Sequence, residues 1–108
     1  MQFGLMLTLS ERYAPGMNMA TSLRQASHLV RMARENGFDG VVSGEHPLAY
    51  PHQRPAPITA LAYLAREAEG MWLATSVLLL PLHSPVQVAE EFATLDGITN
   101  GRTFMGVG

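Results

Sequence analysis

The chain has 108 residues, of which 47% are hydrophobic and 15% are charged, and its formal net charge at pH 7 is −2. This composition is typical of one well-packed soluble domain. The chain contains no cysteine, which excludes disulfides, thiolate zinc sites and cysteine nucleophiles. Its seven basic residues are scattered through the sequence, whereas a nucleic-acid-binding domain would gather them on one face.

The sequence also lacks the marks of a membrane or secreted protein. No apolar run approaches the roughly 18–20 residues that a membrane span needs. The amino terminus has none of the basic, apolar and cleavage regions of a secretory signal. We therefore expect a cytoplasmic protein that binds neither nucleic acid nor membranes.

A strand, a loop and a helix are predicted in the first third of the chain. Residues 2–9 (QFGLMLTL) are mostly apolar and predict a buried strand. Residues 10–19 contain a proline and a glycine and predict a loop that is long enough to line a site. A helix capped by Thr21 or Ser22 follows, with apolar residues at steps of three and four, and the Asn-Gly pair at 36–37 closes it.

A second, short strand is predicted over residues 39–43, and Gly44, Glu45, His46 and Pro47 lie at its carboxyl end. Residues 47–57 contain four prolines and predict an irregular loop on the same side of the sheet. The last of these prolines begins the next predicted helix, which ends at Gly70.

The last third of the chain predicts a strand, a helix and the start of another strand. Residues 72–80 form a near-continuous apolar run, which is typical of a strand covered on both faces in a parallel sheet. Residues 84–87 (SPVQ) predict an N-cap serine, a proline at the first helical position and a capping-box glutamine. The helix closes at 100–101 (NG), and residues 103–108 predict the next strand.

The strands begin at intervals of roughly 30 to 40 residues, close to the length of one βαβ unit. Four strands in the order 1-2-3-4 and three helices would form the first half of a (β/α)₈ barrel, since a complete barrel needs about 250 residues. Residues 1–108 are therefore predicted to be a partial barrel domain, truncated after its fourth strand. The alternative is an open flavodoxin-like sheet, but residues 7–12 (LTLSER) are not the phosphate-binding turn that such a sheet normally carries.

Glu45 and His46 are the strongest candidates for chemistry, because parallel α/β folds bind ligands at the carboxyl ends of their strands. His46 could exchange a proton, or donate a hydrogen bond to a developing anion, near neutral pH. The alternative is a structural histidine that bonds the loop backbone. The predicted strand order places four residues near this end of the sheet: Thr8, Glu45, Leu80 and Gly108.

Two other patterns carry less information. A metal site would need His46, His52 and His83 with Glu45, but the sequence has no H-E-x-x-H motif, and we expect no metal. Residues 106–108 (GVG) could open a G-x-G-x-x-G fingerprint, or they could be glycines at a point where a ligand or a loop backbone approaches the strand. Both interpretations of these glycines place a ligand nearby.

Several segments form a recognisable series along the chain. They are residues 1–4 (MQFG), 36–42 (NGFDGVV), 45–46 (EH), 73–81 (LATSVLLLP), 83–91 (HSPVQVAEE) and 93–102 (ATLDGITNGR), followed by 106–108 (GVG). Together they resemble the amino-terminal part of the bacterial-luciferase-like flavin monooxygenases, a family that includes F420-dependent oxidoreductases. Residues 77–108 are the most specific part, because strand, cap, helix and turn all match in order.

The resemblance implies a barrel that binds FMN or F420 at its carboxyl face. The histidine that matches His46 lies beside the flavin and is implicated in catalysis, while a second histidine found in many members is replaced here by Pro47. Many members have a non-prolyl cis peptide behind the flavin ring, at positions that match Ser76 and Val77. The same pair is frequent in F420-type members, so the resemblance slightly favours F420 over FMN as the cofactor. Gly108 falls where members face the reactive edge of the ring.

We therefore expect a flavin-dependent oxidoreductase or monooxygenase that acts on a small organic substrate, either with reduced FMN and O₂ or by hydride transfer with F420. The family holds the flavin phosphate in loops late in the barrel, so residues 1–108 alone should bind flavin weakly. Their exposed strand edges favour a homo-oligomer. The alternatives are a non-catalytic half-barrel fragment that self-associates, and a flavin-free barrel isomerase or lyase that uses Glu45 and His46.

Overall fold

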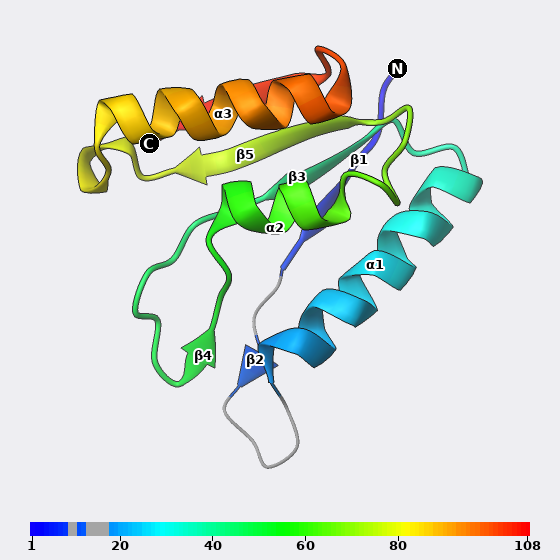
Figure 1. The fold of residues 1–108 in the computed structure, drawn as a ribbon. Helices are drawn as coiled ribbons and strands as arrows, with labels where there is room; N and C mark the ends of the chain where they lie inside the picture. Colours follow the sequence, from blue (N-terminus) through cyan, green and yellow to red (C-terminus); the bar gives the residue numbers. More distant parts are fainter. Residues whose placement is uncertain (9–10, 13–17) are drawn as a thin grey trace.

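The computed structural model describes residues 1–8, 11–12 and 18–108. Within these residues the main element is a four-stranded parallel sheet in the order β1-β3-β5-β6 (Figure 1). Its strands are β1 (Gly4–Leu7), β3 (Gly40–Ser43), β5 (Trp72–Leu78) and β6 (Thr103–Val107). The predicted parallel sheet and the order of its four strands are therefore confirmed.

One α-helix follows each of the first three strands of this sheet: α1 (Met19–Glu35), α2 (Pro57–Leu64) and α3 (Pro85–Thr99). The apolar stripes of these helices and alternate strand residues share one buried core. That core includes Leu7, Val41 and Leu73 of the strands and Ala26, Val30, Leu61, Leu64, Val88, Phe92 and Leu95 of the helices. The described helices are shorter than a membrane span requires or too polar to form one.

The opposite face of the sheet is open. Side chains alternate between the two faces of a strand, so the neighbours of the core residues point away from the helices. Met6 on β1 is 53% exposed and Phe104 on β6 is 60% exposed. A closed (β/α)₈ barrel encloses this face as its interior, which explains why large apolar side chains are found on it.

Trp72 occupies this open face near the amino ends of the strands. Its indole lies over Gly4 and Gly40, where an added Cβ would lie 2.7 Å from the ring at Gly4 and would overlap it at Gly40. The ring also meets Phe104 edge-on, with ring centroids 5.8 Å apart. Two small residues on neighbouring strands thus make room for one large one.

Some predicted boundaries are wrong. Helix α1 begins two residues before Thr21, and its N-cap is Asn18, whose side-chain oxygen accepts the Thr21 backbone N–H at 3.0 Å. Asparagine is as good an N-cap as serine. The first strand was predicted over residues 2–9, but β1 covers only Gly4–Leu7 of the described residues. Residue 9 lies outside the described part. Helix α2 ends at Leu64 and continues towards Gly70 only as turns.

The start of α3 is only partly as predicted. Ser84 stands at the N-cap and Pro85 at the first helical position, but the serine makes no side-chain cap bond. The side chain of Gln87 donates instead to Glu91 one turn later, at 2.9 Å. The expected capping box is therefore not formed. The apolar run predicted over residues 72–80 forms a strand only as far as Leu78, and a 3₁₀ turn, η1 (Leu80–Leu82), follows before α3 begins.

The prediction that residues 47–57 are wholly irregular is also wrong. They contain β4 (His52–Gln53), which pairs antiparallel with β2 (Glu11–Arg12) from the loop after β1. Figure 1 shows this small ribbon beyond the carboxyl end of β1. Prolines within the loop exclude a long strand, but two non-proline residues suffice for this short pairing. The predicted loop over residues 10–19, of which residues 10 and 13–17 lie outside the described part, therefore meets the loop over residues 47–57 through this pairing.

Candidate functional site

The carboxyl end of β3 is joined to the end of β5 by Glu45. Its backbone N–H donates to the Val77 carbonyl at 3.1 Å, and its Oε2 accepts the Leu79 backbone N–H at 2.7 Å. Its Oε1 lies 2.8 Å from Nε2 of His83. Both carboxylate oxygens therefore have partners within the protein. The Glu45 side chain is only 9% exposed. A buried carboxylate requires such partners.

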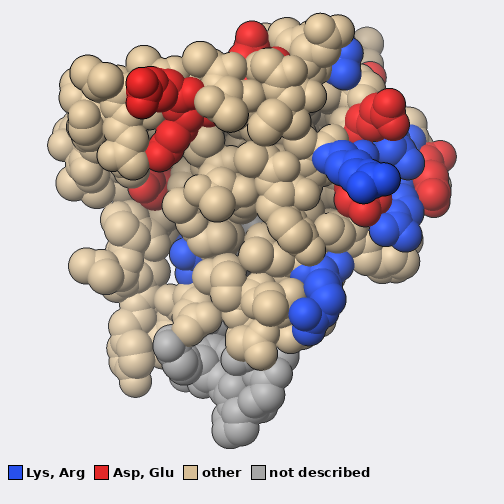
Figure 2. Space-filling view, viewed as in Figure 1, with Lys and Arg blue, Asp and Glu red and all other residues tan. Residues whose placement is uncertain are grey.

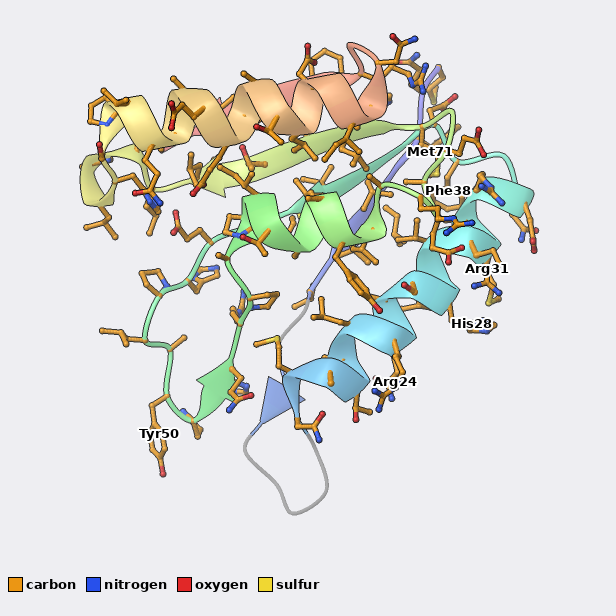
Figure 3. All side chains as sticks on the ribbon, in the orientation of Figure 1. Arg24, His28, Arg31, Phe38, Tyr50 and Met71 are labelled. Carbon is orange, nitrogen blue, oxygen red and sulfur yellow. The ribbon has the colours of Figure 1, made fainter. Side chains whose placement is uncertain are left out.

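His46 takes no part in the hydrogen bonds that Glu45 makes with Leu79 and His83. It is exposed and, with Glu45 and Arg54, lines a hollow of about 200 Å³ whose other lining residues are Pro47, Pro55 and Ala56. Nε of Arg54 is buried and has no hydrogen-bond partner among the described residues. The rest of the loop extends outward, and Tyr50 projects from its tip (Figure 3). An exposed imidazole beside a hollow is placed to meet a ligand.

Ser76 and Val77 lie where the pairing of β5 with β6 is interrupted. The register shifts between Thr75 and Leu78, and the Ser76–Val77 peptide bond is cis. Both residues are exposed, and Val77 is 37% exposed although β5 has a neighbouring strand on each side. The cis bond that the resemblance implied is thus present at the expected pair.

Three glycines allow backbones to approach closely around this irregularity. A Cβ on Gly44 would lie 2.9 Å from the Ser76 carbonyl oxygen, and one on Gly108 would lie 2.6 Å from Cγ2 of Val77. A Cβ on Gly106 would overlap the Thr75 carbonyl oxygen. Glycine at 106 is therefore required by the neighbouring strand, which favours close packing over a dinucleotide-binding fingerprint as the reason for the GVG sequence.

The structure brings most of the predicted site residues to one edge. Val77 bonds Glu45 on one side and contacts Gly108 on the other, while the Gly108 N–H donates to the Leu78 carbonyl at 3.0 Å. The described residues contain no group of three or more acidic or histidine side chains that could hold a metal ion. His83, considered in the sequence only as a metal ligand, is instead the partner of Glu45.

Arg54 and Leu79 were not anticipated by the sequence analysis. The Leu79 N–H belongs to an apolar run with no polar signal, and its role arises only when Glu45 reaches across from β3. Arg54 could have been noticed as a cation in a loop at the carboxyl end of a strand. Its nearness to His46, however, depends on how the loop folds back.

The sequence model of the luciferase-like monooxygenases matches residues 1–108. The chain belongs to this family. A luciferase-like monooxygenase of Escherichia coli K12 is 33% identical over 92 residues, which cover 82% of this chain and 28% of that protein. The luciferase-like family includes FMN-dependent monooxygenases and F420-dependent oxidoreductases.

Solved structures of luciferase-like enzymes have the same fold. The oxygenating constituent of 3,6-diketocamphane monooxygenase from Pseudomonas putida, in complex with FMN, superposes with a TM-score of 0.85 at 25% identity, over all of this chain and 29% of that one. An F420-dependent secondary alcohol dehydrogenase in complex with an F420-acetone adduct gives 0.73 at 26% identity, over 99% and 31%. The chain therefore spans about a third or less of these relatives, and its strands are those of a TIM barrel.

Proposed function

We propose that the luciferase-like protein containing these residues is a flavin-dependent oxidoreductase that acts on a small organic substrate. It would work as a monooxygenase with reduced FMN and O₂, or by hydride transfer with F420. The family membership of the whole chain supports the class of enzyme. The observation that carries the site is the exposure of Ser76 and Val77 at the carboxyl edge of the sheet, beside Gly108.

The residues at this edge fit one face of a flavin ring. A tricyclic ring needs a flat, partly apolar surface with few side chains in the way. Val77 offers exposed apolar area at the carboxyl end of β5, an inner strand of the sheet, and Gly108 leaves the position just after β6 without a side chain. Ser76, Val77 and Gly108 would therefore pack against the ring. We place the grip on the phosphate outside residues 1–108, in loops late in a complete barrel.

His46 would serve the reaction from the adjacent loop. The bound cofactor would supply the redox chemistry, and the histidine would hold or donate a proton beside it. Its exposed imidazole lines the hollow that also contains Arg54, so it can reach a ligand without rearrangement of the sheet. His46 is followed by Pro47, so we propose no catalytic role that needs two adjacent histidines.

The choice between the cofactors is open to a direct experiment on the complete protein. We propose a slight preference for F420, on the basis of the Ser76-Val77 pair. The protein as purified would be denatured and its released cofactor identified by absorption and mass, and the apoprotein would be titrated with FMN and with F420. Binding of either cofactor supports the proposal. Binding of neither contradicts it and favours the flavin-free isomerase or lyase.

A further inference from the structure

We propose that Glu45 is a positioning residue, whose carboxylate holds the end of β5 in the shape that the flavin ring requires. This inference rests on the proposed flavin-dependent function. Glu45 lines the hollow beside His46, but its carboxylate oxygens contact Leu79 and His83, and we place it in contact with neither substrate nor flavin. It would act through the segment Val77–Leu79 and through His83.

The contacts of Glu45 are concentrated on one short segment. Its backbone bonds Val77 at 3.1 Å and its side chain bonds Leu79 at 2.7 Å, so it holds both residues that flank Leu78. The regular pairing of β3 with β5 ends at Ser43 and Thr75. Glu45 therefore replaces the missing ladder bonds at the point where β5 departs from regular strand geometry.

The other side of the same segment is held by Gly108, the residue that follows β6. The Gly108 N–H donates to the Leu78 carbonyl at 3.0 Å, and the Gly108 backbone lies against Val77. The exposed Val77 thus lies between two neighbours, the Glu45 backbone and Gly108, and the charged group of this segment's partners, the Glu45 carboxylate, bonds Leu79. A bond from a backbone N–H to a carboxylate is stronger than one to a neutral acceptor, so the Glu45 side gives the firmer anchor.

His83 completes the arrangement at its more accessible end. Its side chain is 32% exposed and stands just before α3, so the pair ties the helix to β3. A proton on Nε2 makes the 2.8 Å contact a hydrogen bond to the carboxylate. Protonation of Glu45 would remove the negative charge that strengthens both its bond from Leu79 and its contact with His83. This favours positioning over direct proton transfer.

The test compares flavin binding by full-length variants in their apo form. Glu45→Ala removes the side-chain contacts with Leu79 and His83 and keeps the backbone bond to Val77, and it should raise the flavin dissociation constant by roughly tenfold or more, with a changed absorption band of the bound flavin. Glu45→Gln retains an acceptor for Leu79 and should lie between this variant and the wild type. His83→Ala should weaken binding less than Glu45→Ala. The double variant Glu45→Ala/His83→Ala should bind no worse than Glu45→Ala alone, because the two residues act as one unit.

Matched controls and a stability measurement separate positioning from folding. Glu90→Gln and His28→Ala change exposed residues on α3 and α1 and should leave the dissociation constant unchanged. A merely structural role would lower the unfolding temperature of the Glu45 variants without altering their flavin affinity or spectrum, and that result would overturn the inference. If Glu45→Ala does not fold, unchanged affinity in both Glu45→Gln and His83→Ala overturns it equally. A wild-type protein that binds no flavin contradicts the proposed function instead, and the inference falls with it.

Discussion

Trp72 on β5 and Gly40 on β3 are register partners on neighbouring strands, and the Trp72 ring lies over Gly40 on the open face of the sheet. The indole of Trp72 lies so close to Gly40 that an added Cβ would overlap the ring. In a closed barrel this face is the packed interior, where an increase in volume forces neighbours out of their rotamers. The pair therefore gives a direct test of whether this face is packed in the complete protein.

Gly40→Ala in the full-length protein should lower the free energy of unfolding by about 1–3 kcal/mol, the usual cost of overpacking. Urea unfolding measures the change. Gly97→Ala is a matched control, since nothing lies within 4 Å of a Cβ at this position in α3, and it should stabilise by up to about 1 kcal/mol because alanine favours helix over glycine. Equal effects of the two substitutions would show that the Trp72 face is not packed.

Arg31 on α1 and Glu67, between α2 and β5, form a bidentate ion pair on the surface. Nε of Arg31 donates to Oε2 of Glu67 at 3.0 Å, and Nη2 donates to Oε1 at 3.2 Å. Figure 2 shows acidic and basic side chains gathered on this side of the molecule, and Figure 3 labels Arg31. The hydrogen bond with Arg31 lowers the pKa of Glu67, and the same bond raises the pKa of Arg31. Since both groups reach solvent, salt should weaken the pair.

The lowered pKa of Glu67 fixes the sign of the pH dependence. The pair's contribution to stability is fully present above pH 4.5, the ordinary pKa of the carboxyl group, and is lost as the pH falls through the lowered folded-state value. Glu67→Gln should therefore lower the urea midpoint slightly at pH 7 and have less effect in acid. Glu69→Gln, two residues away and exposed, is the control. A Glu67→Gln effect that grows on acidification would contradict the assignment.

His46→Ala in the complete enzyme should lower turnover by roughly 100-fold or more, as expected when a positioned acid or base is removed. The imidazole is exposed and contributes little to the core, so circular dichroism and the unfolding temperature should change little. His28→Ala, which removes an exposed histidine from α1, should leave turnover unchanged. Normal turnover of the His46 variant with its true substrate would remove this residue from the mechanism.

Residues 1–108 expressed alone should self-associate and bind flavin weakly. Strands β1 and β6 are the edges of the sheet, and unpaired edges pair readily with other chains. The open face adds exposed apolar residues such as Met6 and Phe104. Sedimentation and equilibrium dialysis with FMN and with F420 measure both properties. A stable monomer with sub-micromolar flavin affinity would contradict this prediction.

The sequence predicted the sheet because hydrophobic pattern and chain length largely determine it. The apolar run at 72–80 indicated a buried strand, which the structure forms over Trp72–Leu78 with Ser76 and Val77 exposed, and the prolines at 81 and 85 bracketed the turn that follows. The errors lie where competing local bonds decide the outcome. Asn18 caps α1 in place of Thr21, and Gln87 bonds Glu91 in place of the helix end. Both are choices between polar partners of similar energy.

The candidate site residues were predicted at the carboxyl ends of the strands, where the structure places them, but their contacts with one another were not predicted. Periodicity located Glu45 and His46 at the end of a strand, and the family resemblance identified Ser76, Val77 and Gly108. The bond from Leu79 to Glu45 depends on the alignment of two strands at their irregular ends, which the pattern does not specify. The pairing of Glu45 with His83 joins residues 38 positions apart, and nothing local signals it.

The central claim is that residues 1–108 supply one side of a flavin ring site. It is tested most directly by a crystal structure of the complete protein with FMN or F420 bound. The account predicts that the ring lies against Ser76, Val77 and Gly108, with atoms within about 4 Å of Val77, and that the His46 imidazole stands beside it. A ring bound elsewhere, with Val77 still exposed to solvent, would contradict the account.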